Sequence, residues 1–394
     1  MFPRYRLYRR LARGATNRDG FAMFMALGAL VIIGVLVAAS SMVSLQESRL
    51  GQNQLVQSRA FAVAEYGLNK IQADWDRTPN LSMANGERFD TTYSLGGGTA
   101  DVHYVRLNSE TFWIVSEGEA IVGNNTSLAR QARKRIGAIL RLRIPSIKAE
   151  GAVTTGGSFQ SKGSSRVTGN NTLSPGWDAS KCSPGSDKAA VVASPTATVS
   201  IQKDANVTGS PQVSRSTLAA DSNTYVRYGD ETWAALVAQA IIITNGGSTG
   251  GAPSTNADGT CNRSDPDNWG EPKRGSGTVA ACQDYFPILY FTTDVFMHGG
   301  RGQGIMLVNG DFRVNGTFEW HGLIVVRDDI DKSNGTAIVY GAMMARNAET
   351  ADNETTGDFT GSLDAYYSSC ALERAMRGSA LVVQAKERAW TELY

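Results

Sequence analysis

The feature that most constrains how this chain can fold is the segment from Phe21 to Met42, which contains no charged side chain. As a helix it would be ~33 Å long, close to the ~30 Å hydrocarbon core of a bilayer. The residues before it contain a single acid, Asp19, and six arginines, Arg4, Arg6, Arg9, Arg10, Arg13 and Arg18. The positive-inside rule therefore predicts a basic cytoplasmic leader, residues 1–20, then a transmembrane helix and an exported remainder.

Helical periodicity continues beyond the apolar segment, which argues against a cleaved secretory signal, while the arginine-rich extension on one end only argues against a core helix. A secretory signal has a shorter apolar region that ends at a small-residue cleavage site. Here apolar residues recur at spacings of three and four, at Phe61, Ala64, Leu68, Ile71 and Trp75. Pro79 then stops the pattern because proline cannot continue the helical hydrogen bonds. We expect one continuous helix from about Phe21 to Arg77, within a unit of residues 21–78.

Alternating apolar and polar residues follow and predict a small antiparallel sheet in residues 86–145. Its expected strands are Asp101–Leu107, Thr111–Val122 and Arg135–Ile144. One face of the third strand is apolar, and the other carries Arg135, Arg141 and Arg143. An antiparallel sheet with one wet face needs cover on the other face. The stripe Leu68, Ile71 and Trp75 is the nearest cover in the sequence, so we expect the helix to pack on this meander.

Glycine recurs every six residues in two blocks of the distal unit, residues 146–394. The blocks contain Gly151, Gly157, Gly163 and Gly169, and then Gly304, Gly310, Gly316 and Gly322, followed by Gly335 and Gly341. Apolar residues fill the third and fifth positions of the second block, at Met306, Val308, Phe312, Val314, Phe318, Trp320, Ile324 and Val326. A short fixed period predicts a β-solenoid of a few rungs with both blocks stacked. The alternative is an irregular sandwich whose turns happen to fall at this spacing.

An insertion at about 176–284 separates the two blocks. It contains a helix candidate through Trp233, Leu236, Val237, Ala240 and Ile241, and then a polar loop from Gly246 to Gly277. The expected fold class is thus mixed α and β, mainly β. It comprises a long N-terminal helix, a small antiparallel sheet and a Gly-rich, solenoid-like domain.

Four cysteines lie beyond the apolar segment: Cys182, Cys261, Cys282 and Cys370. An even count in an exported region predicts two disulfides, and three pairings are open. Cys261–Cys282 with Cys182–Cys370 is the favoured pairing, because the first bond would close the most polar loop and contribute ~3 kcal/mol on the loop-entropy account. Four buried thiols are the alternative.

The sequence predicts no catalytic residue, metal site or cofactor. The charges nearly cancel, with Lys+Arg 38 against Asp+Glu 37, which gives no basis for nucleic-acid binding. The three histidines, His103, His298 and His321, are far apart, and the chain lacks CxxC, HExxH, GxxxxGK[ST] and GxSxG motifs. The carboxylates Asp328, Asp329 and Asp331 are interpreted as corner and turn residues. Calcium on the loop Glu349–Glu354 is conceivable, but a hydrated loop is the expected state.

The chain resembles PilX-type pilus assembly proteins, a group of minor type IV prepilins. The matching segments are Arg18–Phe21 before the apolar run, Glu47–Gln54, and Ala60–Leu68, which is similar to the "AFxAAExGL" signature. Weaker matches are Pro175–Trp177, Asn268–Pro272, Gly302–Asp311 and Tyr367–Cys370. The resemblance implies that a prepilin peptidase cuts after Gly20 and that Phe21 becomes the methylated N-terminus. It also implies a single-pass protein of the bacterial inner membrane that contacts other pilins through its helix.

One position departs from the pattern of major pilins. Those proteins carry a glutamate five residues into the mature chain, whereas this chain has Met25 there. Without that carboxylate, the ammonium of a neighbouring subunit would remain uncompensated in hydrocarbon, which is costly. The resemblance therefore implies a minor or tip subunit. A membrane-anchored β-helix enzyme acting on polysaccharide and a plain anchored adhesin or scaffold are the alternatives.

Overall fold

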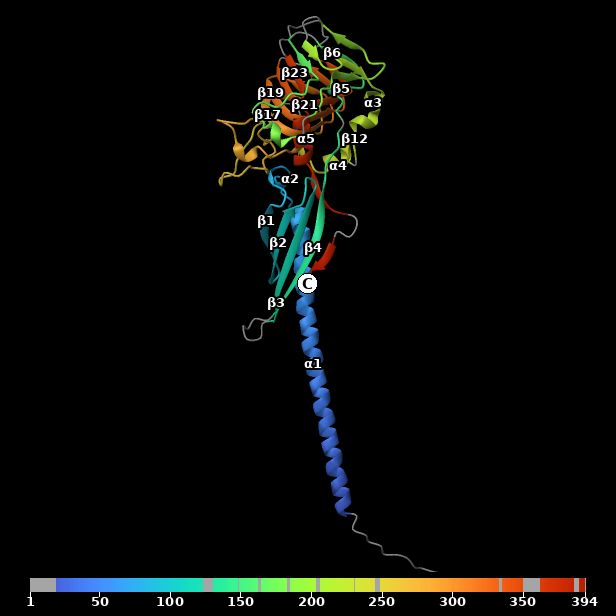
Figure 1. The fold of residues 1–394 in the computed structure, drawn as a ribbon, viewed down its shortest axis with the longest axis vertical. Helices are drawn as coiled ribbons and strands as arrows, with labels where there is room; N and C mark the ends of the chain where they lie inside the picture. The colour runs from blue at the N-terminus through green and yellow to red at the C-terminus, as the bar shows by residue number, and fades with distance from the viewer. Residues whose placement is uncertain are drawn as a thin grey trace, which may run out of the picture.

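A computed structural model describes residues 19–122, 130–147, 149–161, 164–182, 185–202, 206–229, 231–244, 249–332, 335–349, 362–385 and 390–393. A long helix projects from a head in which a small antiparallel sheet lies below a larger curled sheet (Figure 1). Most of the predicted basic leader, residues 1–18, lies outside the described residues. The expected mixed fold, mainly β with a long N-terminal helix, is confirmed.

Helix α1 spans Asp19–Ala73 and confirms the continuous helix, although it ends four residues before Arg77. The chain then turns, and the Trp75 indole donates a hydrogen bond of 3.0 Å to the Asn80 side chain. Pro79 is the first residue of a second short helix, α2 (Pro79–Ser82). Proline is favoured there because its missing N–H would be unpaired in any first turn. The long helix therefore ends before Pro79, as expected, and Pro79 in addition begins a new short helix.

The antiparallel sheet, called here the proximal sheet, contains more strands than the sequence predicted. Its order is β1 (Arg88–Leu95), β2 (Gly98–Arg106), β3 (Thr111–Val122), β4 (Arg130–Arg143) and β24 (Leu381–Gln384), and β25 (Trp390–Leu393) also pairs with β4. The three expected strands correspond to β2, β3 and β4. The last strands correct the sequence-based division, because residues 381–393 return from the distal unit to the proximal sheet.

The second half of α1 covers the apolar face of the proximal sheet. Val63, Ala64, Leu68 and Ile71 are buried there with residues of β2, β3 and β4. The backbones touch at Gly118 of β3, where an added Cβ would lie 2.2 Å from the Ala60 carbonyl oxygen. Only glycine fits this contact, so the position of the helix on the sheet is fixed.

The distal sheet is parallel throughout and curls as it runs from one end to the other (Figure 1). Its second-block strands are β16 (Ile288–Phe291), β17 (Val295–Val308), β18 (Phe312–Val314), β19 (Thr317–Val326), β20 (Asp329–Lys332), β21 (Thr336–Ala345), β22 (Asn347–Glu349) and β23 (Ser362–Tyr367). Its first-block strands are β5 (Gly151–Thr155), β6 (Phe159–Ser161) and β7 (Arg166–Thr168). The start of the expected insertion also belongs to this sheet, because it forms the parallel strands β8 (Ala189–Ala193), β9 (Val199–Ile201), β10 (Asn206–Thr208) and β11 (Val213–Arg215). The blocks adjoin, because β21 pairs with β5 and β23 pairs with β7.

The hexad pattern explains the packing of the second block. All eight apolar residues at its third and fifth positions are buried. Gly304, Gly322 and Gly341 are register partners on β17, β19 and β21, and their φ values are +117°, +140° and +143°. A Cβ on Gly322 would lie 2.1 Å from the Gly304 carbonyl oxygen. The glycines thus form a column in which both the backbone angle and the close contact exclude a side chain.

The insertion is more ordered than its composition indicated. Its helix, α4 (Trp233–Val237), is shorter than expected, because Ile241 already belongs to β14 (Ile241–Ile243), which pairs with β16. The expected polar loop includes β15 (Thr249–Gly251), paired with β17, and the buried residues Asn268, Trp269 and Glu271. In this region, pairing with the distal sheet determines the secondary structure more strongly than the local sequence preferences do.

The remaining elements are short, and the longest of them is a helix beneath the distal sheet, α5 (Ser369–Gly378). The others are α3 (Thr217–Ala220), the hairpin β12 (Arg227–Tyr228) and β13 (Glu231–Thr232), and 3-10 turns at Ala179–Lys181, Ser222–Tyr225 and Ala280–Cys282. The expected turn at Asp331 was partly wrong, because Asp329–Lys332 forms β20 and pairs with β18. In the conceivable calcium loop, Glu349 ends β22, while residues 350–354 lie outside the described residues.

Candidate functional site

The first half of α1 is an apolar surface that nothing in the head covers. Its large apolar side chains are 49–74% exposed from Phe21 to Leu55. The helix is long and apolar enough to span a membrane. A contiguous apolar surface of this size marks an interaction with lipid or with other proteins.

The residues singled out near the chain start lie on this exposed helix. Gly20 and Phe21 are in its first turn, and Met25 follows one turn later. The side chains of Phe21 and Met25 are 66% and 60% exposed. From Phe21, the first acidic residue along the helix is Glu47. The apolar half of α1 therefore contains no carboxylate that could replace the glutamate that major pilins carry at the position of Met25.

A helical stalk separates the apolar segment from the head. Residues 43–55 are exposed, and the first buried residue of α1 is Val56. At ~1.5 Å per residue, this stalk is ~20 Å long. Leu45, Leu50 and Leu55 are exposed along it beside polar side chains. The head is therefore held away from the end of the apolar segment.

The two sheets are joined by hydrogen bonds around α2, a region called here the junction. The Asn80 side chain donates to the carbonyl oxygens of Arg377 and Ala380, at 3.2 and 2.9 Å, at the end of α5. The Arg106 guanidinium donates to the carbonyls of Pro79, Asn80 and Met83. Because these donors are buried and satisfied, the distal sheet is fixed to the top of α1.

A second connection joins the edge of the proximal sheet to the insertion. Arg143 of β4 forms an ion pair with Glu231 of β13, and its Nη2 donates to Glu231 Oε2 at 2.9 Å. Glu231 is buried, with a side chain 3% exposed. Arg143 was expected on a wet face of the sheet, but it is shared between the two units. Arg135 and Arg141 do lie on that exposed face, where they pair with Glu117 and Glu110.

The disulfides join Cys182 to Cys370 and Cys261 to Cys282, which are the pairs that the sequence favoured. The first bond spans a sequence separation of 188 residues and holds the start of α5 against the turn after Trp177. The second closes a separation of 21 residues within the insertion. Both bonds restrict the unfolded chain and so favour the folded head.

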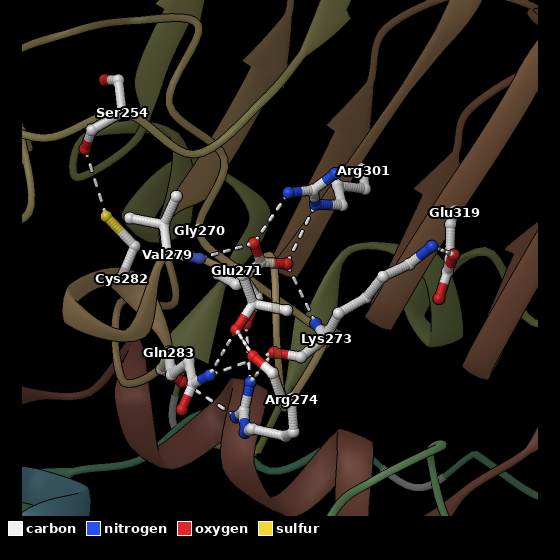
Figure 2. Close-up of polar contacts among 12 residues, drawn as sticks. Ser254, Gly270, Glu271, Lys273, Arg274, Val279, Cys282, Gln283, Arg301 and Glu319 are labelled. Carbon is white, nitrogen blue, oxygen red and sulfur yellow. Dashed lines mark hydrogen bonds and ion pairs between the residues drawn. The ribbon is translucent and has the colours of Figure 1, made fainter.

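A buried cluster of charged residues holds the insertion against the distal sheet (Figure 2). The Glu271 carboxylate is fully buried and accepts two hydrogen bonds from Arg301, at 2.9 and 2.8 Å. It also accepts the backbone N–H groups of Lys273 and Val279. Burial raises the pKa of Glu271, but Arg301 and these N–H groups outweigh burial, so the pKa is lowered. With all its partners in place, this carboxylate is suited to structure rather than to proton transfer.

The same cluster includes a carboxylate–histidine pair. Glu319 accepts from Lys273 at 2.9 Å and lies 3.0 Å from His321 Nε2. Despite burial, hydrogen bonds from His321 and Lys273 lower the pKa of Glu319 to about 2. His321 is buried between the rings of Trp177 and Tyr340, and burial lowers its pKa, although Glu319 opposes this. The His321 side chain is only 1% exposed, so in this structure it presents almost no surface to a substrate.

Acidification is expected to destabilise the distal sheet through His321. Because folding lowers the His321 pKa, the unfolded chain gains a proton that the folded chain resists as the pH falls below ~6.5. The stabilisation that comes from neutral His321 is complete above pH ~6.5. Below that pH it declines by at most ~1.4 kcal/mol per pH unit. Urea unfolding at pH 7.5 and 5.5 should show this loss in the wild type and a smaller one in His321→Gln.

His298→Gln, at an exposed position on β17, is the matched control and should retain the wild-type pH dependence. The pKa of His103 is also lowered, mainly by burial, but His103 is present in all three proteins and cancels in the comparison. Glu319 contributes only at lower pH, because its stabilisation is lost between ~4.3 and about 2. Equal pH dependence in wild type and His321→Gln would contradict the assignment.

The three histidines considered from the sequence lie on three different strands. His103 lies on β2, far along the chain from His298 and His321 on β17 and β19. Within the described residues, no group of three His, Cys, Asp or Glu side chains is arranged to hold a metal ion. Asp328 faces Arg346 across 3.7 Å. The structure therefore brings together Glu319 and His321.

Sequence reasoning missed the buried charges at Arg106, Glu231 and Glu271, and the role of the partly exposed Arg301 as the partner of Glu271. Glu231 and Glu271 lie in polar stretches where periodicity carries no signal, and their partners Arg143 and Arg301 are far away in the sequence. Arg106 lies in a predicted strand, but the pattern gave no sign that its guanidinium binds the carbonyls of α2. The segment Asn268–Pro272, which was noted only for its resemblance, is the one local hint. No family model, curated protein or solved structure matches this chain.

Proposed function

We propose that this chain is a non-enzymatic minor pilin, a pilus assembly subunit of a type IV pilus or a related secretion machine. The observation that carries the proposal is helix α1, whose apolar half is wholly exposed and continues without a break into a half packed on the proximal sheet. A plain membrane anchor has no need of such continuity. A pilin-like subunit does need it, because the same helix must sit in the membrane and later pack among the helices of other subunits.

In this account the apolar half of α1 crosses the bacterial inner membrane once. The arginine-rich leader stays in the cytoplasm, and the head is periplasmic, where both disulfides can form. A prepilin peptidase cuts between Gly20 and Phe21, and the N-terminus of Phe21 is methylated. Neighbouring pilins then contact α1 along its apolar half and along the exposed leucines of the stalk.

The distal domain is proposed to be a short β-solenoid used in assembly or adhesion. Support comes from the register of its long strands, which advances from Gly304 to Gly322 to Gly341 in steps of 18 and 19 residues, or about three hexads per rung. Each step places apolar residues above apolar residues and glycine above glycine, as stacked rungs require.

A position at or near the filament tip follows from two features. Met25 offers no carboxylate to the terminal ammonium of another subunit, so this subunit is poorly suited to receive a neighbour above it. The distal domain also adds a bulk above the proximal sheet that repeated lateral packing would have to accommodate (Figure 1). Neither feature is a cost if no subunit lies above this one.

The rival reading as a membrane-anchored polysaccharide enzyme is less favoured. The carboxylates of Glu231, Glu271 and Glu319 are largely buried, and each is paired with a basic side chain. The imidazole of His321 is buried under aromatic rings. A plain adhesin or scaffold would share this head but would not need processing of its leader.

Stoichiometry in sheared filaments tests the proposal. We expect this chain at a small fraction of the main pilin, and its deletion should reduce filament number or adhesion without removing the main component. Met25→Glu should leave assembly nearly unchanged, because the added carboxylate has no neighbour to serve. Near-equal amounts of this chain and the main pilin along the filament would contradict the tip assignment.

A further inference from the structure

A pocket of about 210 Å³ lies at the junction, where the end of α1 meets the distal sheet. The proximal side contributes Trp75, Arg77 and Thr78 to its lining, and the distal side contributes Arg263 and Tyr285. The pocket is smaller than the ~300 Å³ at which sites for drug-sized ligands begin, so it suits a small ion or a single functional group.

Arg77 is the unusual residue in this pocket. Within the described residues, its guanidinium makes no hydrogen bond and no ion pair, although it is only partly exposed. Burial lowers its pKa, Tyr285 opposes this shift, and the nearby charge of Arg263 lowers the pKa further. A guanidinium carries five N–H donors and stays protonated, so a sheltered one without a partner is unfavourable.

The acidic groups near the pocket are already engaged. Asp76 forms an ion pair with Arg263, which also lies over the Tyr285 ring at 5.6 Å. Asp284 pairs with Arg374 at 2.7 Å. These two pairs cancel in charge, and among the residues that line the pocket Arg77 is the cation left without an acidic partner. Asp265, whose charge also acts on Tyr285, accepts a hydrogen bond from Ser254.

We propose that the pocket binds a small oxyanion, a carboxylate or phosphate group, with Arg77 as its charge partner. The planar fork of Arg77 can donate two parallel hydrogen bonds to such a group. The Tyr285 hydroxyl, which has no hydrogen-bond partner among the described residues, supplies a further donor in the same pocket. Sulfur or halide ligands would leave this bidentate geometry unused.

Binding at this place would couple the two units of the head. The lining comes from the segment after α1 and from the segment that leads into β16, so one anion would be held by both. A ligand that binds the assembled junction, and not the separated units, stabilises that assembly by mass action. An anion bound in this pocket would therefore hold the distal sheet in its position at the end of α1.

Thermal unfolding of the full-length protein in detergent, with inorganic phosphate, acetate or chloride at equal ionic strength, tests this site. We expect phosphate or acetate to raise the Tm above that in chloride by about 2–3 °C at ten times the Kd. A rise with acetate indicates a carboxylate ligand, and a rise with phosphate alone indicates a phosphate ligand.

Arg77→Gln should abolish the anion-dependent rise without lowering the Tm in chloride, because it removes an unpaired charge. Arg59→Gln is the matched control on the exposed face of α1 and should keep the full rise. Arg77→Lys keeps the charge without the fork and should retain a smaller rise. Hydrogen exchange should also slow at residues 76–78 and 284–288 when the anion is present.

Two results would overturn the site. One is an equal rise in wild type and Arg77→Gln, which would place the anion elsewhere. The other is no rise with either oxyanion in the wild type.

Discussion

Gly322→Ala is expected to unfold the distal sheet or to cost about 4 kcal/mol or more of its stability. The new Cβ would lie 2.1 Å from the Gly304 carbonyl oxygen, and backbone cannot move aside as a flexible side chain can. The φ of +140° adds strain for any residue with a Cβ. The same clash recurs one strand further, where a Cβ on Gly341 would lie 1.8 Å from the Gly322 carbonyl oxygen. Relief at one rung would therefore disturb the next.

Gly275→Ala separates the two causes. Gly275 also has a positive φ, +104°, but a Cβ there would meet no atom within 4 Å. This control should lose only the ~1–3 kcal/mol of backbone strain. Urea unfolding followed by circular dichroism measures both variants. If the two substitutions cost the same within about 1 kcal/mol, the stacked column does not determine the stability of the sheet.

Replacing Gly20 with leucine is expected to block removal of the leader completely. The proposed peptidase cuts after Gly20, and a large side chain at the cut position would not fit where glycine is accepted. The uncut protein should remain in the membrane, because the apolar half of α1 is unchanged. An immunoblot against a leader tag would show the tag retained on the full-length protein.

Gly28→Leu makes the same exchange two turns further along the apolar helix and is the control. A Cβ at Gly28 meets no atom within 4 Å, so the head is unaffected. This variant should be processed like the wild type. Loss of the leader from Gly20→Leu at the wild-type rate would contradict the assigned cleavage position.

The sequence predicted the parts of the fold that repeat at a fixed local period. The continuous helix followed from the apolar run and from the stripe Leu68, Ile71 and Trp75, and that stripe does face the proximal sheet. The hexads identified the buried positions of the second block, including Phe318 and Trp320. Such patterns are readable because burial of one face imposes its own period on the sequence.

Elements that depend on distant partners were missed. Strands β24 and β25 have no periodic signal of their own and are strands because β4 offers an edge. Trp269 and Glu271 lie in a polar, glycine-rich stretch, and contacts that the local sequence does not show make their burial favourable: Trp269 packs on Phe291 and Trp320, and Glu271 pairs with Arg301. Arg77 could not be identified from the sequence either, because what distinguishes it is the lack of a hydrogen-bond or ion-pair partner among the described residues of the folded chain.

The mass of the N-terminal peptide from protein extracted from native membranes tests the central claim most directly. We predict a mature chain that begins at Phe21 and carries a methylated amino group, with residues 1–20 removed. That result would place α1 among helices that are processed at the membrane and then assembled. Fully assembled protein that still begins at Met1 would contradict the account and would favour a plain membrane anchor.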